Sequence, residues 1–199
     1  RGVGIANTSS LSQPLVETFA QANLNPRLYP HALDMKWSKL LTNLLANATS
    51  AILGMTPAQI FNDPRLFRLE NEQLREALRV MDALHVRVVD LPGTPTRLLA
   101  WAIRSLPAPI SQPILKSSLG RGRGGKMPSF YLDLTSGTGK SEVDYLNGAV
   151  VRFGLQTGVP TPVNRLLNET LLQLTRGERR IEEFKGQPQK LLSMLDSPL

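Results

Sequence analysis

The sequence predicts an all-α domain that carries a small strand-and-helix remnant at its start. Apolar residues recur at helical spacing along most of the chain. Pro64 and Pro162 directly follow Asp and Thr, residue types that commonly cap the start of a helix. A strand-like pattern occurs only near the amino terminus, so we expect at most one or two strands.

The first elements are short. Residues 3–6 predict a strand, and a helix capped by a serine is expected from about residue 9 to 22. No partner strand is apparent nearby, so the chain opens like a fragment. Prolines within residues 23–30 require extended backbone there, because the residue before a proline disfavours helix.

A long helix is predicted over residues 31–53, because its apolar residues fall on an arc of about 140° when successive residues are placed 100° apart. Gly54 is expected to end it. A second helical stretch begins after Asp63, with Pro64 at its first position, and continues to about Val86 as two helices or one kinked helix.

The helical pattern is interrupted in the middle of the chain. One helix is expected to start at Thr94 and Pro95. Prolines within residues 107–113 should break the helical pattern, and residues 120–126 predict a flexible basic loop.

Ser141, with Asp144 three residues later, resembles a capping box that opens a helix ending at Gly158. A last helix is expected to start at Thr161. The tail from residue 187 is expected to be loosely attached, although its leucines could dock. We therefore divide the chain into an opening strand-and-helix segment (1–25), a helical domain (26–185) and a tail (186–199).

Composition limits the class of protein. The chain has 199 residues, of which 41% are hydrophobic, which is too apolar for general disorder. It has no Cys and two His, which excludes a disulfide scaffold or a thiol nucleophile and argues against a metal site. No apolar run is long enough to span a bilayer and no signal-peptide pattern opens the chain. We expect a cytoplasmic protein without a membrane or metal partner.

The net charge of +7 is concentrated in one segment. Between Leu91 and Leu132 there is no Asp or Glu, whereas basic residues occur at Arg97, Arg104, Lys116, Arg121, Arg123 and Lys126. Such a segment could contact nucleic acid, a phosphate-bearing cofactor, a carboxylate substrate or only water.

Two phosphate-loop patterns lack the required context. Gly120, Gly122 and Gly125 satisfy G-x-G-x-x-G, but no strand precedes them and arginines separate them. Residues 139–141 imitate the end of a Walker A loop, but Leu134 stands where its first glycine belongs. The sequence therefore identifies no cofactor-binding residue.

A polar strip, formed by Lys36, Lys39, Asn43 and Asn47, runs along the long predicted helix. The last three fall at about 240°, 280° and 320° on the helical wheel, at the edge of the apolar arc. One interpretation is a solvated face. The other is the wall of a cleft, because asparagines are poor helix-interior residues and two of them are stacked one turn apart.

Glu142 lies 4, 7 and 11 positions before Leu146, Ala149 and Phe153, so it is expected on the buried stripe of its helix. Alternatively, the carboxylate of Glu142 lies in the first turn of the helix only because it interacts favourably with the helix dipole there. If the carboxylate is buried it needs a cation, and Lys39 is the candidate.

Ser129 follows the basic loop and could cap a helix or contact an anion. His31 and His85 have no spacing partner and are expected to be structural.

Three segments resemble the carboxy-terminal domain of the ketopantoate reductase (2-dehydropantoate 2-reductase) family. They are KWSKLLTNLLAN at 36–47, PSFYLD at 128–133 and EVDYLNGAVV at 142–151, followed by GVPTP at 158–162 and Asn164. The resemblance extends from residue 1 to about Leu174. It implies a helical substrate-binding and catalytic domain (26–185) of the 6-phosphogluconate dehydrogenase C-terminal-like type. Residues 1–25 would then be the last strand and helix of a nucleotide-binding Rossmann domain.

The resemblance also implies NADPH-dependent reduction of 2-dehydropantoate to pantoate, in pantothenate and coenzyme A synthesis. Lys39 matches the catalytic lysine, which protonates the carbonyl oxygen. Asn43, Asn47 and Ser129 match substrate-binding residues, and Glu142 matches the catalytic acidic residue that contacts the substrate hydroxyl. NADPH would be bound mainly by a Rossmann domain absent from this chain, without which we expect little activity.

Three alternatives stay open. Related reductases with similar carboxy-terminal halves act on other 2-oxo acids. A helical module could bind nucleic acid through its Arg-Gly loop, although that loop has no aromatic residue for stacking. The chain could also be a dimerisation domain, and a homodimer is compatible with the reductase interpretation.

Overall fold

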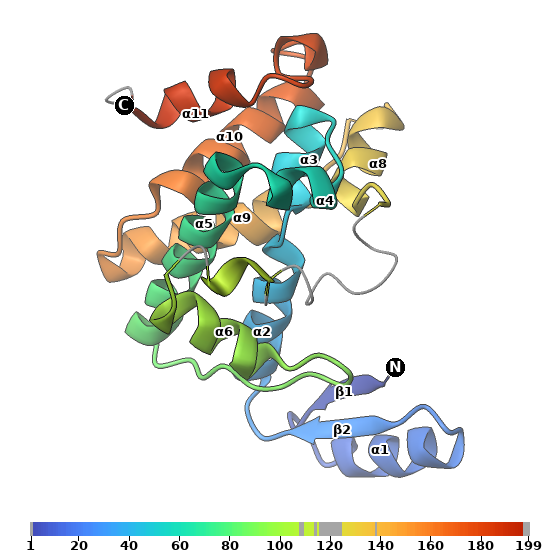
Figure 1. Cartoon of the computed structure of the whole chain (residues 1–199). Coiled ribbons are helices and arrows are strands. Elements are labelled where there is room, and N and C mark those ends of the chain that lie inside the picture. Colours follow the sequence, from blue (N-terminus) through green and yellow to red (C-terminus); the bar gives the residue numbers. More distant parts are fainter. Residues whose placement is uncertain (1, 108–109, 114, 116–124, 138, 197–199) are drawn as a thin grey trace.

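The protein is described by a computed structural model that covers residues 2–107, 110–113, 115, 125–137 and 139–196 (Figure 1). Most of these residues are helical, which confirms the predicted fold class. The elements are β1 (Val3–Ala6), α1 (Ser12–Gln21), β2 (Pro26–Tyr29), α2 (Ala32–Leu44), α3 (Asn47–Leu53), α4 (Pro57–Asn62), α5 (Pro64–Ala83), α6 (Thr96–Ser105), α8 (Ser129–Thr135), α9 (Val143–Thr157), α10 (Pro162–Thr175), a 3₁₀ turn (Ile181–Glu183) and α11 (Pro188–Asp196).

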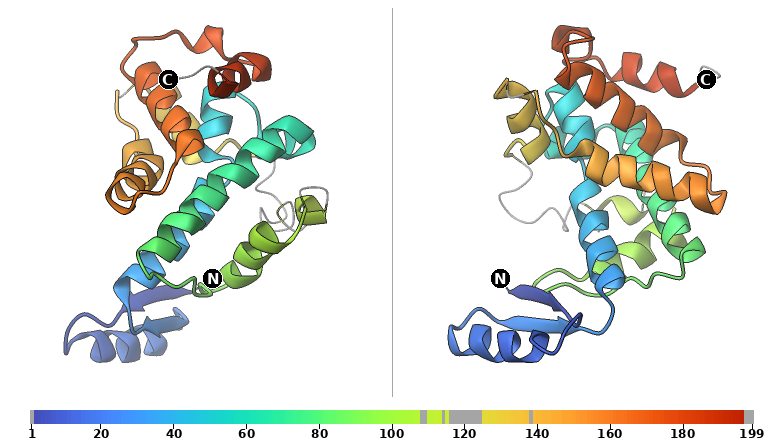
Figure 2. Two further views of the ribbon diagram at one scale, coloured as in Figure 1. Left: turned by 90° about the vertical axis from the view of Figure 1, so that its left-hand side faces the viewer. Right: turned by 180° about the vertical axis from the view of Figure 1, so that it is seen from behind.

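The amino-terminal strand has a partner, which the sequence prediction missed. β1 pairs with β2 in parallel, from Val3 opposite Pro26 to Ala6 opposite Tyr29. The extended backbone expected over residues 23–30 therefore forms the second strand, and α1 is the connection between the two. This β1–α1–β2 unit lies at one end of the molecule, and α11 lies at the other (Figure 2).

The long helix predicted over residues 31–53 is wrong, because the chain breaks between α2 and α3. Ala46 adopts a left-handed conformation with φ of 51°. Its amide donates a hydrogen bond of 2.8 Å to Oε2 of Glu70, and Nε2 of Gln73 donates one of 3.0 Å to the carbonyl oxygen of Leu44. Side chains from α5 thus satisfy backbone groups that a continuous helix would have paired internally.

The predicted start of α5 is confirmed. The Asp63 carboxylate accepts hydrogen bonds from the amides of Arg65 and Leu66, and Pro64 is the first helical residue. The helix is continuous to Ala83 and contacts α2, α6, α9 and α10. α5 is therefore the central support of the helical domain.

The core lies between α5 and the helices around it. Its largest fully buried side chains include Phe61 and Phe130. Leu191 of α11 is also fully buried, so the expected loose tail docks on the core through one of its leucines.

The proline-rich segment differs from the prediction, because residues 110–113 are helical. The predicted start of α6 after Pro95 is confirmed. Most of the basic loop, including Gly120, Gly122 and the arginines between them, lies outside the described residues.

Candidate functional site

The polar strip is divided by the break between α2 and α3. Lys39 is exposed and Asn43 is half-buried, one turn apart on α2. Asn47 is the first residue of α3, not a further turn of the same helix. The strip therefore bends at the point where it meets the core.

Asn47 brings two distant segments together. Its side chain is 8% exposed, and Nδ2 donates a 3.2 Å hydrogen bond to the carbonyl oxygen of Asn43. Oδ1 accepts one of 3.2 Å from the amide of Phe130, and Nδ2 lies 3.5 Å from Oγ of Ser129. The contact with Ser129 is long for a hydrogen bond, whereas the other two have ordinary lengths.

Ser129 is the first residue of α8 and is exposed. Pro128 occupies the cap position, and no side chain caps this helix, so the cap interpretation of Ser129 is wrong. The next residue, Phe130, is buried and anchors α8 against the core. The structure thus brings Asn43, Asn47 and Ser129 together, one turn beyond Lys39.

Glu142 does not occupy the buried position predicted for it. It is exposed and directly precedes the first residue of α9, and Ser141 accepts a 3.2 Å hydrogen bond from the amide of Val143. Among the ion pairs of the described residues, none joins Glu142 to Lys39. The proposed compensation of a buried carboxylate by Lys39 is therefore not needed.

The prediction for Glu142 was wrong because the buried stripe of α9 begins one residue later, at Val143. The buried residues of α9 are Val143, Asn147, Gly148, Val150 and Gly154, whereas Leu146 and Phe153 are half-buried. Positions 0, 4, 7 and 11 from Val143 form the buried face, and Glu142 lies about 80° from its edge. Because the buried residues of α9 include one Asn and two Gly, counting apolar side chains does not identify this face.

A buried polar network joins α5, α9 and α10, and sequence reasoning missed it. Its members are Glu70, Gln73, Glu76, Asn147 and Asn164. Nδ2 of Asn147 donates to Oε1 of Gln73 and to Oδ1 of Asn164, each at 3.1 Å. The Asn164 amide group donates to Oε2 of Glu76 at 2.7 Å. Polar residues at positions 70, 73 and 76, inside the apolar spacing of α5, were the available signal.

Both carboxyl groups of the network have raised pKa values. Burial raises the pKa of Glu70 to about 7, against the opposing effect of hydrogen bonds from Thr49 and the Ala46 amide. Burial also raises the pKa of Glu76, which accepts from the amides of Val163 and Asn164 at the start of α10. These groups contact helix ends and buried side chains, so they support the fold around the site.

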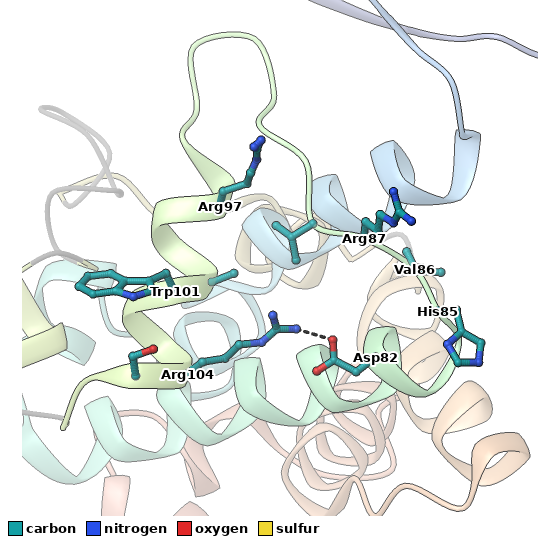
Figure 3. A pocket seen from close by; sticks show the side chains of 10 residues that line it. Asp82, His85, Val86, Arg87, Arg97, Trp101 and Arg104 are labelled. Carbon is teal, nitrogen blue, oxygen red and sulfur yellow. Dashed lines mark hydrogen bonds and ion pairs between the residues drawn. The ribbon is translucent and has the colours of Figure 1, made fainter.

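A separate cavity of about 610 Å³ lies between α6 and the segment after α5 (Figure 3). Its rim carries Arg87, Arg97 and Arg104 with the exposed Trp101. Arg104 pairs with Asp82 at 2.6 Å and Arg97 with Asp90 at 3.6 Å, which offsets much of the positive charge. None of the predicted site residues lines this cavity.

Among the residues that the structure describes, none of the helices has the length and apolar character that a membrane span requires. In the same ranges, no group of three or more His, Asp or Glu side chains is placed to hold a metal ion.

Comparison with known proteins places the chain among reductases. The model of the family "Ketopantoate reductase PanE/ApbA C terminal" matches residues 32–175. The 2-dehydropantoate 2-reductase of Pyrobaculum aerophilum is 29% identical over 167 residues, which cover 84% of this chain and 52% of that protein. Its counterpart from Streptococcus pyogenes serotype M1 is 24% identical over 176 residues, covering 85% and 51%.

Solved structures of reductases and dehydrogenases have the same fold. A PanE/ApbA family ketopantoate reductase from Ralstonia eutropha JMP134 superposes with a TM-score of 0.70 at 26% identity, covering 89% of this chain and 53% of that one. A D-mandelate dehydrogenase in complex with NADH shares the fold, with a TM-score of 0.68 at 19% identity over 88% and 55% of the two chains. The chain spans about half the length of the curated relatives it matches. On the family match and the helical fold together, it belongs to the ketopantoate reductase PanE/ApbA C-terminal family.

Proposed function

We propose that this chain is the substrate-binding half of an NADPH-dependent reductase that converts 2-dehydropantoate to pantoate. The observation that carries the proposal is the convergence of Asn43, Asn47 and Ser129, one helical turn from an exposed lysine. An amide and a hydroxyl group in contact, with an ammonium on the preceding turn of α2, suit a substrate that has a carboxylate, a carbonyl and a hydroxyl.

Lys39 is the proposed proton donor. An ammonium can stabilise negative charge on the carbonyl oxygen as it develops and then deliver the proton. The exposure of Lys39 leaves its three N–H donors accessible to a substrate. Glu142, also exposed, is proposed to contact the substrate hydroxyl.

Asn43 and Ser129 are the proposed first contacts for the substrate carboxylate and hydroxyl. Asn47 is largely occupied by its bonds to Asn43 and Phe130. Its 3.5 Å contact with Ser129 is weak enough for a substrate oxygen to replace it. We therefore propose that Asn47 both orients Ser129 and binds substrate after that exchange.

NADPH would supply the hydride. The described residues do not fit a dinucleotide pyrophosphate, because β1 is followed by Asn7 and Thr8 and not by a glycine-rich turn into α1. We therefore propose that the cofactor is held by a nucleotide-binding half, the Rossmann domain that the family resemblance implies, in the part of the relatives' length that this chain does not cover.

The test uses the chain joined to that nucleotide-binding half, with NADPH oxidation followed during addition of 2-dehydropantoate. Lys39→Ala should lower turnover by about 10²- to 10⁴-fold, the usual contribution of a general acid. Lys36→Ala is the matched control, because Lys36 is also exposed on the polar strip of α2. Equal turnover in the wild type and Lys39→Ala would remove the lysine from this role.

The substrate itself is tested in the same assay. A phenyl-substituted 2-oxo acid is the appropriate competitor, since a D-mandelate dehydrogenase shares the fold. A higher kcat/KM for 2-dehydropantoate supports the pantoate assignment, whereas a preference for the aryl acid moves the chain to another reductase of this fold.

A further inference from the structure

We infer that Gln73 is a positioning residue that couples the two halves of the proposed substrate site, the α2–α3 break and the start of α9. The inference rests on the proposed function and extends it to a side chain that no substrate would touch. Gln73 is completely buried near the middle of α5.

The first half of the coupling is at the end of α2. Nε2 of Gln73 donates a 3.0 Å hydrogen bond to the carbonyl oxygen of Leu44, the last residue of α2. Leu44 directly follows Asn43, and Asn47 begins α3 three residues later. The same Nε2 lies 3.4 Å from Oε2 of Glu70, which accepts from the Ala46 amide. Gln73 and Glu70 therefore hold the bend that aligns the two asparagines.

The second half is on α9. Oε1 of Gln73 accepts a 3.1 Å hydrogen bond from Nδ2 of Asn147, which is 1% exposed. Asn147 lies five residues after Glu142, about one and a half helical turns along. One amide side chain thus contacts both the helix that carries Lys39 and the helix that follows Glu142.

A purely structural role explains this arrangement less well. Burying amide groups is costly unless each is paired, and apolar side chains of similar volume would stabilise the core at least as well. Hydrogen bonds, unlike apolar contacts, fix direction as well as distance.

The test compares Gln73→Met with Asn71→Leu in the chain joined to its nucleotide-binding half. Met keeps the length of Gln and removes its hydrogen bonds. Asn71 is the matched control because it is 3% exposed on the same helix and outside the network. We expect Gln73→Met to lower kcat/KM for the 2-oxo acid at least about tenfold, with KM for NADPH unchanged, because misplacing site residues lowers the rate steeply. Asn71→Leu should leave both parameters near the wild-type values.

A second measurement does not need activity. In ¹H–¹⁵N spectra, the side-chain amide of Asn47 and the backbone amide of Phe130 report the geometry of the α3–α8 contact. Both signals should move in Gln73→Met and stay in place in Asn71→Leu. Asn147→Leu should move the same signals, and the double variant Gln73→Met/Asn147→Leu should add little to either single change.

The outcomes of these experiments distinguish the proposed function from the positioning role of Gln73. A wild-type enzyme inactive on every 2-oxo acid, with signals that move as expected, would refute the proposed function and retain Gln73 as the residue that sets the geometry. An active enzyme with unchanged kinetics in Gln73→Met, or equal effects in Asn71→Leu, would overturn the inference.

Discussion

Glu70 should make the stability of this protein fall as the pH rises through neutrality. Its carboxyl is fully buried between α5 and the α2–α3 break, where Thr49 and the Ala46 amide donate hydrogen bonds to it. Burial raises its pKa from 4.5 to about 7. The folded state therefore holds a proton that the unfolded chain has already lost over that pH range.

The magnitude follows from the two pKa values. Each pKa unit corresponds to about 1.4 kcal/mol, so ionisation of Glu70 costs the native state about 3 kcal/mol. The contribution of the protonated form is complete below pH 4.5, declines between pH 4.5 and 7, and is absent above that range. Glu70→Gln keeps an oxygen for the Ala46 amide and removes the ionisation.

Urea unfolding at pH 5, 6, 7 and 8 measures the effect. The free energy of unfolding of Glu70→Gln minus that of the wild type should rise by about 3 kcal/mol from pH 5 to pH 8. Taking the difference removes the pH dependence of Glu76, whose pKa is also raised. Glu169→Gln is the control, because Glu169 is an exposed carboxylate on α10, outside the buried network. A difference that stays constant with pH would refute the assigned ionisation.

Three further substitutions test the packing and the helix ends, each by urea unfolding at pH 6. Phe130→Ala should cost about 3–5 kcal/mol, because the ring is 1% exposed and anchors α8; a loss below 1 kcal/mol would contradict that anchoring. Asp63→Ala should cost about 1 kcal/mol by removing the cap of α5, with no change in the slope against urea. His85→Gly should raise stability by up to about 1 kcal/mol, because exposed His85 has φ of 56°, where glycine is unstrained; a decrease would show that its side chain makes a stabilising contact.

Local signals predicted helix ends well. Asp63 caps α5, Gly158 ends α9 with φ of 71°, and Pro162 is the first residue of α10. Each signal depends on a side chain and its neighbours within a few residues, so the sequence alone contains the information. The break at Ala46 is different because Leu and Ala favour helix there, and side chains more than twenty residues away decide the outcome.

The same distinction applies to the candidate site. The polar strip was recognised because Lys39 and Asn43 lie one turn apart on a single helix. Glu142 was misplaced because the core face of α9 contains Asn147 and Gly154, which an apolar count ignores. Gly154 is on that face because an added Cβ would lie 2.8 Å from the carbonyl oxygen of Val159.

Buried polar residues at apolar spacing are therefore informative in this fold. Glu70, Gln73 and Glu76 occupy successive turns of α5, and a helix selected only for stability would place apolar residues there. Their partners are the α2–α3 break, α9 and the start of α10. The α2–α3 break lies between Asn43 and Asn47, and α9 directly follows Glu142. We therefore expect the exposed groups of the proposed site to stay free for a substrate, while hydrogen bonds from α5 hold the α2–α3 break and α9.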